Sequence, residues 1–151
     1  MTPILLRLPR RLFLLLSIVP LAAITAPPPA AAAETTDITI EVFAARRDEA
    51  GFSGPAKRYA SKFSQLGYRG ARLIDTLTAK RRPVGSSVRL QFRDPKGKEQ
   101  TIVVKVDAAG PNARFDVSIP AYKFRSQTRH VNGGTFMVVL AKQDLFLAVR
   151  P

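Results

Sequence analysis

Residues 88–119, VRLQFRDPKGKEQTIVVKVDAAGPNARFDVSI, decide the fold that this sequence predicts. Three segments of the stretch alternate apolar with polar side chains, which is the period of a strand with one buried face. Two loops rich in Gly, Pro, Asp and Asn separate the segments. The stretch therefore predicts two consecutive antiparallel hairpins.

The register of the first hairpin follows from burial and charge together. In one register the buried positions face each other as Val88 with Val104, Leu90 with Ile102, and Phe92 with Gln100. This register also places Arg93 opposite Glu99. A register one residue shorter would place Ile102 opposite Arg89 on the polar face, because a slip of one residue reverses both faces. We therefore expect the longer loop, residues 94–98.

The second hairpin is registered by the same reasoning. Its apolar pairs are Ile102 with Ile119, Val104 with Val117, and Val106 with Phe115. Two opposite-charge pairs agree with this register, Lys105 with Asp116 and Asp107 with Arg114. Exposed charge pairs contribute about 1 kcal/mol or less, so their main value here is to fix the register.

The segments before these hairpins predict a strand, a helix and another strand. Residues 37–43 alternate with the period of a half-buried strand, and residues 55–66 place apolar side chains at helical spacing after a Ser-Gly-Pro start. In residues 71–79 the apolar side chains share one strand face, with Asp75 among them. A basic turn is expected over residues 80–85.

The segments after the hairpins predict three more strands. Pro120 interrupts the chain, and residues 121–129 resume an alternating strand. Residues 135–140 and 145–149 are apolar on both faces, so we expect their hairpin in the middle of a sheet or between two layers. The predicted fold class is α+β: a largely antiparallel β-sheet or sandwich of about eight strands, with one amphipathic helix after the first strand.

Residues 1–33 predict a cleavable export signal followed by a Pro/Ala tether, and residues 34–151 a single exported β-rich domain. Three arginines precede an apolar run over residues 12–24, and Ala31 to Ala33 supply small residues for cleavage before Glu34. The run has 13 residues, whereas a bilayer span needs roughly 20. We expect no permanent membrane span, and a periplasmic or extracellular location.

The route of export stays open between two signals. Arg10 and Arg11, followed by Leu-Phe-Leu, resemble the core of a twin-arginine signal. The strongly apolar, Leu-rich run instead favours an ordinary secretory signal. The sequence contains no cysteine, which excludes disulfides and lipid attachment to an N-terminal Cys.

The charge of the chain is strongly basic. Three of the 24 Lys and Arg and none of the 11 Asp and Glu lie before residue 34, so the rest carries a net charge of +10. Export argues against nucleic acid as a partner, which leaves an acidic envelope protein, an anionic polymer or an anionic lipid surface. A surface that is only solubilising is the alternative.

Nine basic residues are the predicted partner-binding set. Those on alternating strands share a face, and the others lie in the predicted turns. If their strands were neighbours, they would form one cationic stripe. The set comprises Lys80, Arg81, Arg82, Arg89, Arg93, Lys96, Lys98, Lys123 and Arg125.

We predict that the protein is not an enzyme and needs no metal or other cofactor. His130 is the only histidine, which is a poor ligand supply for zinc. A triad of His130, Ser126 and Asp144 lacks the strained turn that exposes a nucleophile. Asp75 is the one carboxylate among apolar positions, and it carries the alternative function, a small secreted carboxylate-dependent hydrolase. A structural role is favoured for Asp75, in which it bonds a backbone group, faces the end of the helix or marks a bulge.

Overall fold

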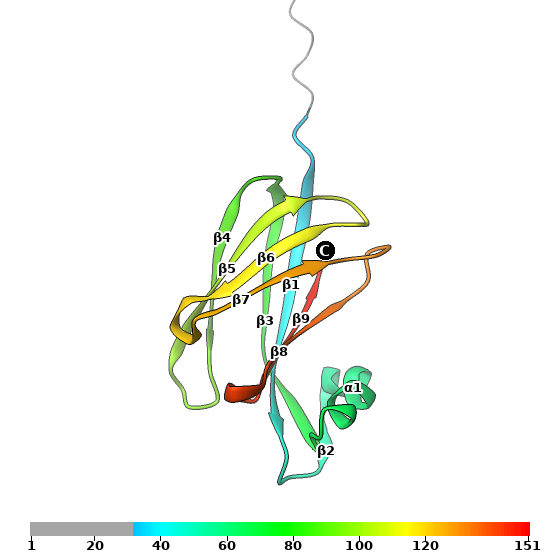
Figure 1. The fold of residues 1–151 in the computed structure, drawn as a ribbon, viewed down its shortest axis with the longest axis vertical. Coiled ribbons are helices and arrows are strands. Elements are labelled where there is room, and N and C mark those ends of the chain that lie inside the picture. Colours follow the sequence, from blue (N-terminus) through cyan, green and yellow to red (C-terminus); the bar gives the residue numbers. More distant parts are fainter. Residues whose placement is uncertain (1–31) are drawn as a thin grey trace, which may run out of the picture. The chain divides into compact units, whose positions relative to one another are not determined.

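The structure, a computed structural model, describes residues 32–151 (Figure 1). The predicted export signal, up to residue 31, lies outside them. The described part forms a five-stranded sheet with the strand order β2-β3-β1-β9-β8 and a four-stranded sheet with the order β4-β5-β6-β7. All strand pairs are antiparallel except β2 with β3. The predicted α+β fold class is confirmed.

The strands of the five-stranded sheet are β1 (Thr35–Arg46), β2 (Gly51–Phe52), β3 (Gly70–Pro83), β8 (Phe136–Leu140) and β9 (Leu145–Arg150). Those of the four-stranded sheet are β4 (Ser87–Arg93), β5 (Glu99–Ala108), β6 (Arg114–Ile119) and β7 (Phe124–Arg129). Two short 3-10 turns, η2 (Pro120–Tyr122) and η3 (Ala141–Gln143), precede β7 and β9. The nine strands exceed the predicted eight or so by the two-residue β2.

The predicted helix comes after the first strand, as expected, but in two parts. Its first half is the 3-10 helix η1 (Gly54–Tyr59), and its second half is the α-helix α1 (Ala60–Gln65). Pro55 stands at the start, where a missing N–H costs nothing. Phe63 is fully buried beneath the helix. The helix therefore covers apolar side chains of the five-stranded sheet.

Two separate cores stabilise these layers. The inter-sheet core joins the two sheets through fully buried side chains such as Ile40, Val104 and Leu147. The helix-side core lies on the opposite face of the five-stranded sheet, where Phe63 packs edge-on against Phe43 and Phe146 with ring centroids 5.8 and 4.8 Å away. The five-stranded sheet is thus covered on both faces over part of its length.

The predicted register of the first hairpin is confirmed, including Arg93 opposite Glu99. The second hairpin is confirmed at Val104 with Val117, Val106 with Phe115 and Lys105 with Asp116. The expected pair of Asp107 with Arg114 is wrong, because a register shift after Val106 places Ala108 opposite Arg114. A bulge adds one unpaired residue to a strand, and alternation alone does not reveal it.

The predicted basic turn over residues 80–85 is confirmed only at Val84 and Gly85. β3 continues to Pro83, and a second irregularity in its pairing with β1 accommodates Arg81, whose φ is 49°. The expected central position of the last hairpin is confirmed for one of its two strands. β9 lies inside the sheet between β1 and β8, but β8 is at the edge.

Candidate binding site

One edge of the four-stranded sheet has free backbone groups. Just beyond the ends of the β4–β5 ladder, the Asp94 N–H donates to Lys98 O and the Val106 N–H donates to Ser86 O, both at 2.9 Å. Bonding alternates along an antiparallel strand, so the even-numbered residues of β4 bond β5. The N–H and C=O groups of the odd-numbered residues between 87 and 93 therefore point away from β5. We call this side of the strand the β4 edge.

The side chains of the same odd-numbered residues are exposed. Arg89, Gln91 and Arg93 lie on the outer face of the sheet, whereas Val88 and Phe92 point into the inter-sheet core and are 9% and 2% exposed. This split follows from the two-residue period of the strand. Each of the three outer residues thus offers both a polar side chain and a free backbone group.

β3 is the other open strand on this side of the structure, next to β4 (Figure 1). A groove lies between the two strands. β3 pairs with β2 only at residues 70 and 71, so beyond them β1 is its only partner strand in the described chain. Two adjoining hollows of about 510 and 390 Å³ share Gln91. We call them together the β3–β4 groove, and its lining includes Ile74, Thr76, Leu77, Arg89, Leu90 and Arg93.

The groove has an apolar floor, and its charged lining consists of two arginines and two carboxylates. Ile74 and Leu90 are partly buried and pack against the inter-sheet core. Within residues 32–151, neither Arg89 nor Arg93 has a carboxylate within 4.0 Å. Across the sheet, Arg89 faces Val103 while Arg93 faces Glu99. Arg89 is therefore the less compensated of the two positive charges.

Asp75 also lines the groove, in company with Glu99. Its carboxylate accepts a hydrogen bond from the Thr76 N–H at 2.8 Å. It stands beside the register shift between β1 and β3 at Val42 and Phe43. Two of the structural expectations for Asp75, a bond to the backbone and a bulge, are confirmed. The shared hollow with Glu99 is a juxtaposition that the sequence did not predict.

Three predicted binding residues lie at the far end of β3. The Lys80 ammonium pairs with Asp37 at 2.9 Å, and the Arg81 N–H donates to the same carboxylate at 2.9 Å. These bonds, the backbone one first, hold the pKa of Asp37 below its ordinary value. The Nε of Arg82 is buried with no hydrogen-bond partner among the described residues. The side chain of Lys80 is thus paired within the fold, whereas Arg81 contributes only its backbone N–H.

Lys96 and Lys98 lie in the β4–β5 loop, as predicted. Asp94 organises this loop by accepting from both of their N–H groups at 2.9 Å, and from the Gln100 amide and Tyr122 hydroxyl at 3.0 Å. Desolvation raises the pKa of Asp94, but the hydrogen bonds together outweigh it and lower the pKa. Burial and Asp94 raise the pKa of Tyr122 to about 12.

Lys123 and Arg125 lie by β7, at the opposite edge from β4. β5 and β6 separate the two edges, so the structure does not join the nine predicted residues into one stripe. Arg125 forms a bidentate pair with Asp116, which is only 8% exposed. That hydrogen-bonded guanidinium lowers the pKa of Asp116. Of the predicted set, Arg89 and Arg93 are the two that line the β3–β4 groove.

The structure does not assemble the triad of His130, Ser126 and Asp144. His130 is buried, its Nδ1 donates to Gly134 O at 2.8 Å, and its Nε2 lies 3.0 Å from the Thr128 hydroxyl. Asp144 instead accepts from the Tyr68 hydroxyl at 2.9 Å. Both ring nitrogens of His130 therefore have partners within the fold, and its role is structural.

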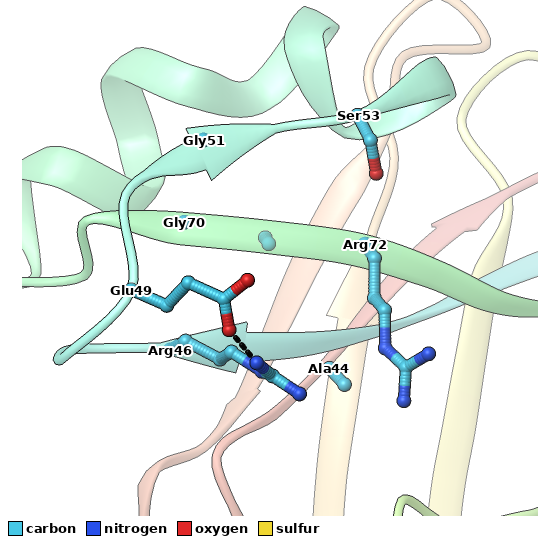
Figure 2. A pocket seen from close by; sticks show the side chains of 8 residues that line it. Ala44, Arg46, Glu49, Gly51, Ser53, Gly70 and Arg72 are labelled. Atoms are coloured by element: carbon cyan, nitrogen blue, oxygen red, sulfur yellow. Dashed lines mark ion pairs between the residues drawn. The ribbon is translucent and has the colours of Figure 1, made fainter.

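A smaller hollow of about 200 Å³ lies where β1 ends and β2 and β3 begin (Figure 2). Arg46 there forms an ion pair with Glu49, and the side chain of Arg72 extends from β3 (Figure 2). The sequence did not single out these residues. Because Glu49 already compensates Arg46, this hollow is a weaker candidate for an anion than the groove.

Within residues 32–151, no cluster of three His, Cys, Asp or Glu side chains could hold a metal ion. The described chain also contains no helix long and apolar enough to cross a membrane. Comparisons with protein-family models, curated proteins and solved structures found no match.

Proposed function

We propose that the protein is an exported binding domain without catalytic activity, and that it holds an acidic segment of another envelope protein at the β4 edge. The observation that carries this proposal is that free backbone groups coincide, beside a groove, with two arginines, Arg89 and Arg93, that form no ion pair within residues 32–151. Natural edge strands carry charges that discourage unwanted pairing, and the same charges select an oppositely charged partner.

A protein partner is favoured over an anionic polymer or a lipid surface by the shape of the site. Polymers and lipid headgroups respond to the sum of nearby charge, whereas the predicted basic residues lie at different edges of the structure and two of them, Lys80 and Arg125, are paired internally. A strand with free hydrogen-bonding groups and an apolar floor instead fits an extended polypeptide. Net charge would then steer the encounter, and the edge would select the partner.

The test is charge reversal at the edge. Arg89→Glu together with Arg93→Glu should lower capture of the partner by at least about tenfold, because each substitution replaces attraction with repulsion. The measurement is cross-linking in intact cells of the native host, followed by purification of the tagged protein at low and high salt. The melting temperature should stay nearly constant, since both side chains are exposed.

Arg114→Glu together with Arg129→Glu is the matched control. It changes the net charge equally, but on exposed residues of β6 and β7, so capture should persist. If both double variants lower capture to the same extent and salt releases whatever is bound, total charge is the determinant. An anionic polymer or lipid would then be the partner, and the proposal would be wrong.

A further inference from the structure

We infer that the partner's segment joins the four-stranded sheet as an additional strand, antiparallel to β4, and carries acidic residues four positions apart. This inference rests on the proposed function and names the kind of ligand. The outward N–H and C=O groups of Arg89, Gln91 and Arg93 can each exchange a pair of hydrogen bonds with the residue opposite. Residues in such a pair have their side chains on the same face, about 5.5 Å apart at Cα.

The side chains of β4 then dictate the segment's sequence. Residues opposite Arg89 and Arg93 lie on the outer face and should be Asp or Glu, with a polar residue between them opposite Gln91. The two intervening residues point inward over the groove floor, where Ile74 and Leu90 are only partly buried. These positions should be apolar. The expected core is acidic, apolar, polar, apolar, acidic.

A second copy of this chain does not fit the edge. Antiparallel pairing of two β4 strands about Gln91 would place Arg89 of each copy opposite Arg93 of the other. Like charges directly opposite destabilise a strand pair. The uncompensated charge at Arg89, which faces Val103 within the sheet, adds to this repulsion. An acidic segment turns the same two residues into attractive pairs.

The probe is a fluorescent, capped peptide with the core Glu-Val-Thr-Val-Glu, titrated into the purified protein by fluorescence anisotropy. Methylation of the central Thr amide removes a hydrogen bond to the edge and should weaken binding by about tenfold. Methylation of a Val amide is the control, since that N–H points away from β4, and it should change affinity by less than about threefold. A peptide with the two Glu residues adjacent keeps the charge and should bind weakly.

Substitutions in the protein, in place of changes to the peptide, test the same strand pairing. Gln91→Pro removes an outward N–H that no bond within the sheet uses, and should abolish peptide binding while the protein stays folded by circular dichroism. If that variant does not fold, the double variant Arg89→Glu with Arg93→Glu provides the test: it should lose the acidic peptide and bind its Lys-Val-Thr-Val-Lys counterpart. Amide NMR shifts should move in residues 87–93 and stay fixed in residues 124–129.

Equal effects of the two methylated peptides, or no binding up to about 1 mM peptide, would overturn the inference. Neither result would overturn the proposed function by itself, which depends on capture in cells and its loss on charge reversal. Equal loss of capture in the two charge-reversal double variants, with release by salt, would overturn the proposed function, whichever peptide binds. The two failures are therefore distinguishable.

Discussion

At the scale of single residues, Gly70 occupies a position that has no room for a Cβ atom. A Cβ at this position would lie 2.5 Å from the carbonyl oxygen of Glu49 and 2.7 Å from that of Gly51. Both are backbone atoms, so no rotamer change relieves the contact. Figure 2 shows Gly51 and Gly70 on the neighbouring strands β2 and β3. The close approach of these strands therefore depends on glycine.

Gly70→Ala should lower the free energy of unfolding by about 2 kcal/mol, because the strands must move apart to admit the methyl group. Urea denaturation followed by circular dichroism measures the change. Gly97→Ala is the comparison: its Cβ would meet open space, so that variant should lose only about 1 kcal/mol from its left-handed backbone. A Gly70→Ala protein as stable as the parent would contradict the argument.

At the scale of elements, the helical segment packs on the sheet through Ala56, Tyr59 and Phe63, of which the largest fully buried side chain is that of Phe63. Its ring is fully buried and contacts Phe43, Phe52 and Phe146, with centroids 4.8 to 5.8 Å away. Phe63→Ala should lower the free energy of unfolding by about 3–5 kcal/mol, since it removes the centre of the helix-side core. Urea denaturation again provides the measurement.

Leu66→Ala is the matched control on the same segment. Leu66 is 46% exposed, so its truncation should cost well under about 1 kcal/mol. A folded Phe63→Ala protein should still bind the acidic peptide, because the helix-side core and the β3–β4 groove lie on different parts of the structure. Similar stability losses in the two variants would rule out Phe63 as a main attachment of the helical segment.

Some of the strands and their registers could be predicted from the sequence, and others could not. The β4–β5 register was predictable because apolar positions and the Arg93–Glu99 pair agree on one alignment. The bulge at Arg81 in β3 and the bulge in β5 were not predictable, since the conformation of an inserted residue such as Arg81 is set by its neighbours and not by its own type. β2 was missed because two residues carry no periodicity.

At the scale of the described molecule, the candidate site was predicted only in part. Alternation assigned Arg89 and Arg93 correctly to an exposed face, but it says nothing about strand order, so the separation of β4 from β7 came only from the structure. Ile74 and Thr76 were missed for the same reason. They join the site because two sheets pack together and leave the edges of β3 and β4 side by side.

Acid stability belongs to the described molecule as a whole, because carboxylates with lowered pKa values occur in both sheets or the loops beside them. Asp37, Asp94 and Asp116 all have pKa values below the ordinary one in the folded state. Between the folded and unfolded values the unfolded chain binds more protons, so acid favours unfolding. The stabilisation should be complete above about pH 4–5 and should disappear as the pH falls through the folded values.

Asp94→Asn tests this pH dependence, because Asp94 accepts four hydrogen bonds that join the β4–β5 loop to Gln100 and Tyr122. The variant should lose about 1–2 kcal/mol at pH 7 and show a shallower decline between pH 5 and pH 3 in urea denaturation. Asp48→Asn, which removes an exposed loop carboxylate, should keep the parent's decline. If Asp94→Asn and the parent lose stability with the same slope, Asp94 does not contribute to acid sensitivity. The decline would then have to come from Asp37, Asp116 and the growing repulsion in a domain that is already basic.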